Sequence, residues 1–77
     1  MAALPWDAVT AATIHVEPRR GRWVVREEET GPEPLSEHGD ATAATHAARE
    51  RARRFKEVTV LLHDRYGRVR RLQTFRR

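Results

Sequence analysis

The fold is decided by one stretch of the chain, residues 13–27, which reads TIHVEPRRGRWVVRE. Apolar and polar residues alternate on each side of a basic connection that contains one glycine, and a period of two is typical of half-buried strands. Pro18 should end the first strand, because proline has no amide hydrogen for a ladder. Residues 23–27 should form the second strand. We predict an antiparallel hairpin whose core-facing residues are Ile14, Val16, Trp23 and Val25.

An alanine-rich segment in the middle of the chain predicts the single helix. Residues 28–39 precede it, and their two prolines, two glycines and four acidic residues are typical of a loop. Asp40 is a good N-cap, because its carboxylate can accept hydrogen bonds from the free amides of the first turn. We predict a helix over residues 41–56. The stripe that would face a sheet consists of Ala44, Ala48, Ala52 and Phe55.

The last third of the chain predicts a second hairpin. Residues 57–63 have the strongest strand pattern of the sequence, and residues 64–67, Asp-Arg-Tyr-Gly, are typical of a tight turn. Residues 68–75 return as the fourth strand. One face of the third strand carries Val58, Val60 and Leu62.

The parity of the fourth strand is irregular. Val69 and Phe75 share a face, whereas Leu72 lies on the other. We therefore expect a bend, a bulge or an edge position in this strand.

These elements predict one small α+β domain of the order ββαββ over residues 13–75. Two antiparallel hairpins form a sheet that one α-helix covers, and a 77-residue chain supports no second domain. Residues 1–12 are an N-terminal extension, either a short helix or a loose tail, and residues 76–77 are a basic end. The predicted core consists of Ile14, Val16, Trp23, Val25, Ala48, Ala52, Phe55, Val58, Val60, Leu62, Val69 and Phe75.

Short motifs along the predicted domain resemble a known protein family. They are Ile14-His15-Val16-x-Pro18, Gly21-x-Trp23-x-Val25, Ala44, Ala47-Ala48-Arg49-Glu50, Ala52-Arg53, Leu62-His63, Gly67-Arg68-Val69 and Phe75. In this order they are similar to small bacterial proteins grouped as domain of unknown function 2188. The resemblance implies a two-hairpin sheet covered by one helix, and the family carries no established activity. The sequence departs from the pattern at Thr45 and Arg51, where larger aliphatic residues are usual, at Tyr66, and in its extra residues 1–12.

Charge is unevenly distributed along the chain, whose net charge is +4. Residues 1–38 carry four arginines and seven acidic residues, a net charge of −3. Residues 39–77 carry ten arginines and one lysine against four acidic residues, a net charge of +7. This division favours either pairing between the two halves or a basic face that meets an anionic partner.

Composition excludes several classes of protein. Without cysteine the chain forms no disulfide and no thiolate metal site. Its longest apolar run is four residues, at positions 1–4, far short of a membrane span. The first residues lack the basic and apolar regions of a signal peptide. We therefore expect a cytoplasmic protein that does not bind membranes.

Neither the histidines nor the lone serine predict a catalytic or metal site. His15 and His63 both lie on the face away from the predicted core, and they are neighbours if their strands pair. Because no His-x-x-x-His spacing occurs, we interpret the histidines as solvent-facing or turn-capping residues and expect no metal and no cofactor. Ser36 lies in a predicted loop without triad partners, and Asp40 is explained as a cap. We expect no enzymatic activity and no small-molecule substrate.

The arginines leave two functions open. If both hairpin turns lie at one end of the sheet, their arginines form a basic rim beside Tyr66, which suits weak, sequence-tolerant nucleic-acid binding. The interpretation we favour is a non-enzymatic interaction or accessory module. In it, the arginines pair with the acidic half, and an exposed strand edge or helix face binds a protein partner or a second copy. The nucleic-acid contacts of the first interpretation are Arg49, Arg53, Arg65, Tyr66, Arg68, Arg70 and Arg71.

Overall fold

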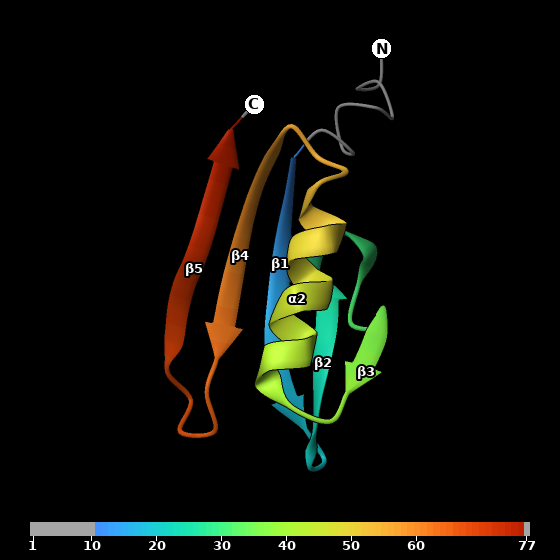
Figure 1. Ribbon diagram of the computed structural model, residues 1–77, viewed down its shortest axis with the longest axis vertical. Helices are drawn as coiled ribbons and strands as arrows, with labels where there is room; N and C mark the ends of the chain where they lie inside the picture. The colour runs from blue at the N-terminus through green and yellow to red at the C-terminus, as the bar shows by residue number, and fades with distance from the viewer. Residues whose placement is uncertain (1–10, 77) are drawn as a thin grey trace.

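The chain builds a five-stranded mixed sheet with one helix on one of its faces (Figure 1). The computed structural model describes residues 11–76, so nearly all of the predicted N-terminal extension lies outside the described residues. The strands are β1 (Ala11–Arg19), β2 (Arg22–Glu27), β3 (Ser36–His38), β4 (Glu57–His63) and β5 (Val69–Arg76), and they lie in the order β3-β2-β1-β4-β5. The helix is α2 (Ala41–Ala52), and a short 3-10 helix, η1, spans Glu28–Thr30.

The α+β class is confirmed, but the predicted layout of two hairpins is incomplete. Both hairpins form, β1 with β2 and β4 with β5. They join along β1 and β4, which run parallel, with Ile14 opposite Val60. The prediction of an uninterrupted loop over residues 28–39 is wrong, because β3 pairs with β2 there. β3 has no apolar period of its own, and backbone pairing holds it against a strand already in place.

The end of β1 corrects a second prediction. The strand continues through Pro18 to Arg19 instead of ending at the proline. Pro18 lies beyond Val16, the last residue of β1 that pairs with β4, so one side of β1 needs no ladder bond there. The two-residue turn that follows has positive φ at both Arg20 (53°) and Gly21 (78°), as in a type I′ turn.

The helix begins where predicted and ends one turn early. The Asp40 carboxylate accepts a hydrogen bond from the amide of Ala43 at 2.7 Å, which is the expected N-cap. The predicted continuation to residue 56 is wrong, because α2 ends at Ala52. The chain then tightens into a turn in which the Phe55 amide bonds the Ala52 carbonyl, and Phe55 is buried. In the described part of the chain, no helix is long and apolar enough to cross a membrane.

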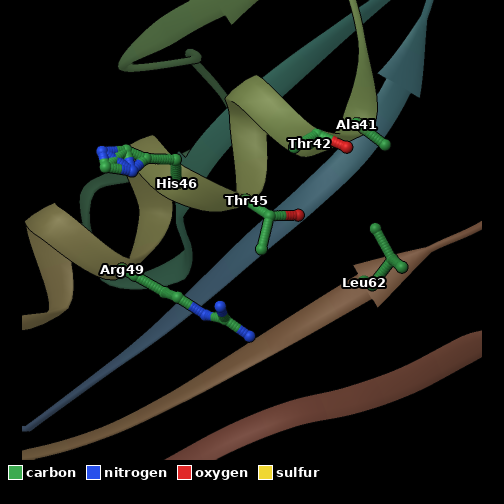
Figure 2. Close-up of a pocket in the computed structure, with 6 residues that line it drawn as sticks. All are labelled: Ala41, Thr42, Thr45, His46, Arg49 and Leu62. Atoms are coloured by element: carbon green, nitrogen blue, oxygen red, sulfur yellow. The ribbon is translucent and has the colours of Figure 1, made fainter.

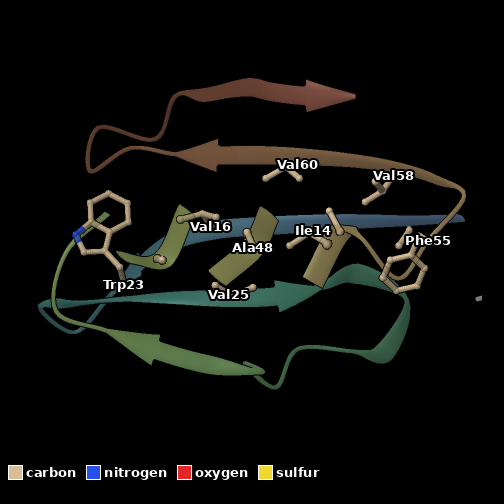
Figure 3. Packing of buried hydrophobic residues seen from close by; sticks show 11 residues of the cluster. Ile14, Val16, Trp23, Val25, Ala48, Phe55, Val58 and Val60 are labelled. Carbon is tan, nitrogen blue, oxygen red and sulfur yellow. The ribbon is translucent and has the colours of Figure 1, made fainter. Parts of the chain in front are cut away.

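The core lies between α2 and the face of the sheet that it covers (Figure 3). Small alanines on α2 let the helix approach β1 and β2 closely, and Ala44, Ala48 and Ala52 are fully buried. Of the predicted core residues, Leu62 and Phe75 are only partly buried at the margin of this cluster. The others that face the helix are buried, namely Ile14, Val16, Trp23, Val25, Ala48, Ala52, Phe55, Val58 and Val60.

An irregularity in β5 explains why Val69 is not in the core. The register passes from Val60–Gln73 to Leu61–Arg71, so Leu72 is the extra residue of a bulge. This confirms the expected irregularity of the fourth strand. The residues of β5 before the bulge therefore project from the opposite face to the one that strict alternation would give them. Val69 points away from the helix and is 54% exposed. The prediction that Val69 packs in the core is wrong.

Candidate functional site

A polar cluster occupies the face of the sheet opposite α2. His15 on β1 and His63 on β4 alternate with core residues and point away from the helix. Because β1 and β4 are neighbours, the two rings meet, with 2.7 Å between His15 Nδ1 and His63 Nε2. The expected proximity of these histidines on paired strands is therefore present. The interpretation of His15 as solvent-facing is wrong, because it is only 6% exposed.

The segment after β2 helps to enclose His15. η1 folds over β1, where the Glu29 carboxylate accepts a hydrogen bond from the Thr13 amide at 3.0 Å. Glu28 Oε1 lies 3.0 Å from His15 Nε2. Both nitrogens of the His15 ring are therefore engaged, one by a histidine and the other by a carboxylate. The acidic run after β2 lies on this face through contacts that no periodicity in the sequence indicates.

Glu17 completes the cluster from its position two residues after His15. Its carboxylate accepts hydrogen bonds from Arg26 Nη2 at 3.1 Å and from Arg19 Nη2 at 3.2 Å. Burial alone would raise the pKa of Glu17, but the hydrogen bond and charge of Arg26 outweigh it and lower the pKa overall. Burial lowers the pKa of His63, and the adjacent His15 adds to this effect. One potential ligand atom from each of His15, Glu17 and His63 lies within 4.8 Å of the others.

A second feature is a basic rim at the end of the sheet where both hairpin turns lie (Figure 1). The parallel pairing of β1 and β4 places their turns at the same end, as the nucleic-acid interpretation requires. One pocket there is lined by Pro18, Arg19, Arg20, Gly21, Arg22 and Arg65. Tyr66 is 84% exposed beside it, and the Arg68 guanidinium lies 5.8 Å from the Tyr66 ring centre. Arg65 instead lies over the buried Trp23 ring, at 6.0 Å.

The other predicted nucleic-acid contacts do not join this rim. Arg49 extends from α2 toward β4 and lines a pocket that also contains Leu62 (Figure 2). Arg70 is opposite Leu62 in the register, and Arg71 is opposite Leu61, so these two arginines project from opposite faces of β5. Arg53 follows the last turn of α2, where it pairs with Glu50. The seven predicted residues therefore form no single surface.

Pairing with acidic groups accounts for about half of the described arginines. The ion pairs are Arg19–Glu17, Arg22–Glu37, Arg26–Glu17, Arg51–Glu27, Arg53–Glu50, Arg68–Asp64 and Arg76–Glu57. Within residues 11–76, no acidic group lies within ion-pair distance of Arg20, Arg49, Arg54, Arg65, Arg70 or Arg71. Of these seven ion pairs, only Arg51–Glu27 joins an arginine of residues 39–77 to an acidic residue of residues 1–38, so the predicted pairing between the two halves is largely absent from residues 11–76.

The third feature is the outer edge of β5. In the described residues β5 pairs only with β4, and α2 lies over β1 and β2 rather than over β5 (Figure 1). Leu62, Leu72 and Phe75 are half-buried on the helix side of this hairpin. Beside them the Gln73 Oε1 atom is buried and has no hydrogen-bond partner in the described structure.

Comparison with known proteins gives one match. A family model described as an uncharacterised protein conserved in bacteria (DUF2188) matches residues 14–75. No curated protein and no solved structure matches the chain. The matched segment runs from the middle of β1 almost to the end of β5, and it contains the helix, the histidine pair and both hairpin turns. Because most of the chain is covered in this way, the protein belongs to the uncharacterised bacterial family DUF2188.

Proposed function

We propose that this domain is a non-enzymatic interaction module that associates with a second copy of itself through β5. The two edges of the sheet differ in a way that supports this. β3 is only three residues long, and the segment before it contains Pro32 and Pro34, so it offers little to a further strand. β5 is eight residues long and contains no proline, and β4 is the one strand of the described residues that pairs with it.

The observation that carries the proposal is the facing pattern of β5. Antiparallel partners that lie opposite each other must project from the same face of the sheet. The bulge at Leu72 makes the pattern of β5 identical when read from either end, with its centre between Leu72 and Gln73. Residues on the helix side are Arg70, Leu72, Gln73 and Phe75, and those on the other side are Val69, Arg71, Thr74 and Arg76. A two-fold axis between Leu72 and Gln73 therefore pairs two copies with every residue facing correctly.

This register is also chemically favourable. Arg71 lies opposite Thr74 of the second copy, and Arg70 lies opposite its Phe75, so no two arginines oppose each other directly. Leu72 lies opposite Gln73 of the second copy, so the half-buried helix-side residues of the two β5 strands form one continuous strip. The buried Gln73 Oε1 atom, which has no partner in the described structure, lies beside the axis, where a donor from the second copy would satisfy it.

The register predicts opposite effects for two substitutions at one exposed position. Thr74→Glu places a carboxylate opposite Arg71 of the second copy, and Thr74→Arg places a like charge there. Each opposed charge pair contributes about 0.2–1 kcal/mol and occurs twice, so we expect the dimer dissociation constant to fall or rise by roughly two- to thirtyfold. Sedimentation equilibrium measures this constant, and circular dichroism checks that the monomer fold is retained.

A second substitution tests the register itself. Adding Arg71→Glu to the Thr74→Arg variant restores two opposed pairs and should tighten the dimer again. Wild-type protein that is monomeric at every concentration rules out the proposal. A dimer that responds equally to both Thr74 substitutions uses another surface.

Nucleic-acid binding is the second candidate, and the basic rim favours it. Arg20 offers a clean test, because Arg20→Gly removes a charge at a position whose φ of 53° suits glycine. We expect this variant to weaken binding to single-stranded and duplex DNA and to reduce the salt dependence by one phosphate contact. Arg54→Gln, which removes a charge that lies outside the rim, is the matched control and should change binding little. Wild-type protein that binds no DNA at about 50 mM salt excludes this candidate.

A further inference from the structure

We propose that His15, Glu17 and His63 bind a divalent transition-metal ion of the zinc class on the face of the sheet opposite α2. Three potential ligand atoms, one from each residue, lie within 4.8 Å of one another. They project from β1, the central strand of the sheet, and from its neighbour β4, and sites on paired strands are held more precisely than sites on loops. This site is independent of the β5 edge and of the basic rim.

The distance between the two histidine nitrogens is close to that in a metal complex. Bonds of about 2.0–2.1 Å to zinc place tetrahedral ligand atoms roughly 3.4 Å apart. His15 Nδ1 and His63 Nε2 are now 2.7 Å apart, so the two rings need to separate by less than an ångström. His63 is only half-buried, and rotation of its ring can supply this movement.

Glu28 supplies the second contact that a metal-binding histidine usually makes. Metal-ligating histidines commonly donate their other N–H to a carboxylate, which fixes the tautomer and orients the ring. Glu28 Oε1 lies 3.0 Å from His15 Nε2, so a proton on Nε2 directs the Nδ1 lone pair toward His63. In the metal-free state His63 Nε2–H donates to that lone pair. When the ion binds, the proton on His63 Nε2 is exchanged through solvent for one on His63 Nδ1. His63 Nε2 then becomes a ligand, with no net release of protons.

Charge and donor type define the class of ion. Two imidazoles and one carboxylate suit Zn²⁺, Ni²⁺, Cu²⁺ and Fe²⁺, whereas Mg²⁺ and Ca²⁺ prefer an all-oxygen set. Glu17 and Glu28 each contribute a negative charge near the ion, and Glu17 shares its charge with Arg19 and Arg26. Arg26 holds the Glu17 carboxylate in place by two hydrogen bonds. Oε2 also accepts a hydrogen bond from Arg19, whereas Oε1 accepts only from Arg26 and keeps a lone pair for the metal. Three protein ligands leave a fourth position for water.

Calorimetric titration of the full chain, without an affinity tag, with zinc chloride tests the proposal. We expect saturable binding of one ion, reversed by a chelator. His63→Gln and Glu17→Gln should each weaken binding at least tenfold, and Glu28→Gln should weaken it by about 10–100-fold, the usual effect of losing an outer partner. His46→Gln removes an exposed helix histidine and serves as the matched control, with unchanged affinity.

Imidazole NMR signals of the unaltered protein provide a test that no folding defect can confuse. Zinc should shift the ring signals of His15 and His63 together and leave those of His46 in place. Absence of one-to-one binding overturns the proposal. Binding that moves the His46 or His38 signals instead, or that survives His63→Gln in a folded variant, also overturns it.

Discussion

Replacing Trp23 by alanine is expected to lower the free energy of unfolding by about 3–5 kcal/mol, the usual cost of truncating a buried tryptophan. Trp23 is 9% exposed and fills the end of the core nearest the hairpin turns (Figure 3). No other aromatic residue in the described core lies at that end, so a cavity there cannot be refilled. The total stability of a small domain is about 5–15 kcal/mol, and much of it therefore depends on this side chain. Urea unfolding followed by circular dichroism measures the change.

Two controls separate packing from the contact with Arg65. Trp23→Phe keeps an aromatic ring in the core and should lose clearly less than Trp23→Ala. Arg65→Ala removes the side chain whose guanidinium lies 6.0 Å from the Trp23 ring centre, and should cost about 0.5–1 kcal/mol. If Trp23→Ala unfolds at the same urea concentration as the wild type, Trp23 contributes a surface contact rather than core packing.

Arg51→Met is expected to destabilise the domain by about 3 kcal/mol, because it leaves the Glu27 carboxylate buried without its cation. The Glu27 side chain is 5% exposed at the end of β2, and Arg51 Nε contacts its Oε2 at 2.5 Å from α2. Removal of one partner from a buried ion pair is costly, whereas exposed pairs contribute little. Thermal and urea unfolding at neutral pH measure the loss.

Two control variants test whether the unpaired charge of the buried Glu27 carboxylate causes the loss of stability. Arg49→Met lies on the same helix and has no acidic partner in residues 11–76, so it should change stability by only a few tenths of a kcal/mol. Glu27→Leu combined with Arg51→Met removes both charges and should recover most of the loss. If the double variant is as unstable as Arg51→Met alone, the packing of the arginine stem determines the effect and not the charge of Glu27.

The ion pair also explains why a charged residue stands on a helix face near the core. Arg51 is half-buried on α2, where it contacts Glu27. Its partner Glu27 lies far away in the sequence, at the end of a strand whose period-two pattern places it on the core side. The strand pattern thus indicated the face of Glu27, but only the packing of α2 on β2 shows why a carboxylate is tolerated there.

Local patterns predicted the elements better than they predicted how these join. The alternation of apolar and polar residues correctly predicted the bounds of β4, and Asp40 correctly predicted the start of α2. Both features depend only on residues that are neighbours in the sequence. β3 was missed because its three residues gain their structure from β2. Val69 was misplaced because a single extra residue at Leu72 reverses parity, and the sequence indicated an irregularity without locating it.

The polar cluster, too, was only partly predictable from the sequence. Parity placed His15 and His63 on the face away from the core, and their strands needed only to be neighbours for the rings to meet. The sequence did not indicate that β1 and β4 pair in parallel, nor that η1 folds back over His15. Without those two facts the histidines look like isolated surface residues. Glu17 shares the face of His15 through the period of two along β1, whereas Glu28 joins the cluster through a tertiary contact.

The parallel pairing of β1 and β4 also governs how the chain can assemble. Each hairpin closes a short loop, but Ile14 meets Val60 only after a long loop containing α2 has closed, at a larger cost in chain entropy. That cost is recovered only when the alanines of α2 pack on strands from both ends of the chain, because the core draws on β1, β2 and β4 together. The helix packs on β1 and β2 of the first hairpin and on β4 of the second. The domain should therefore fold as one cooperative unit, more slowly than a helical protein of similar size.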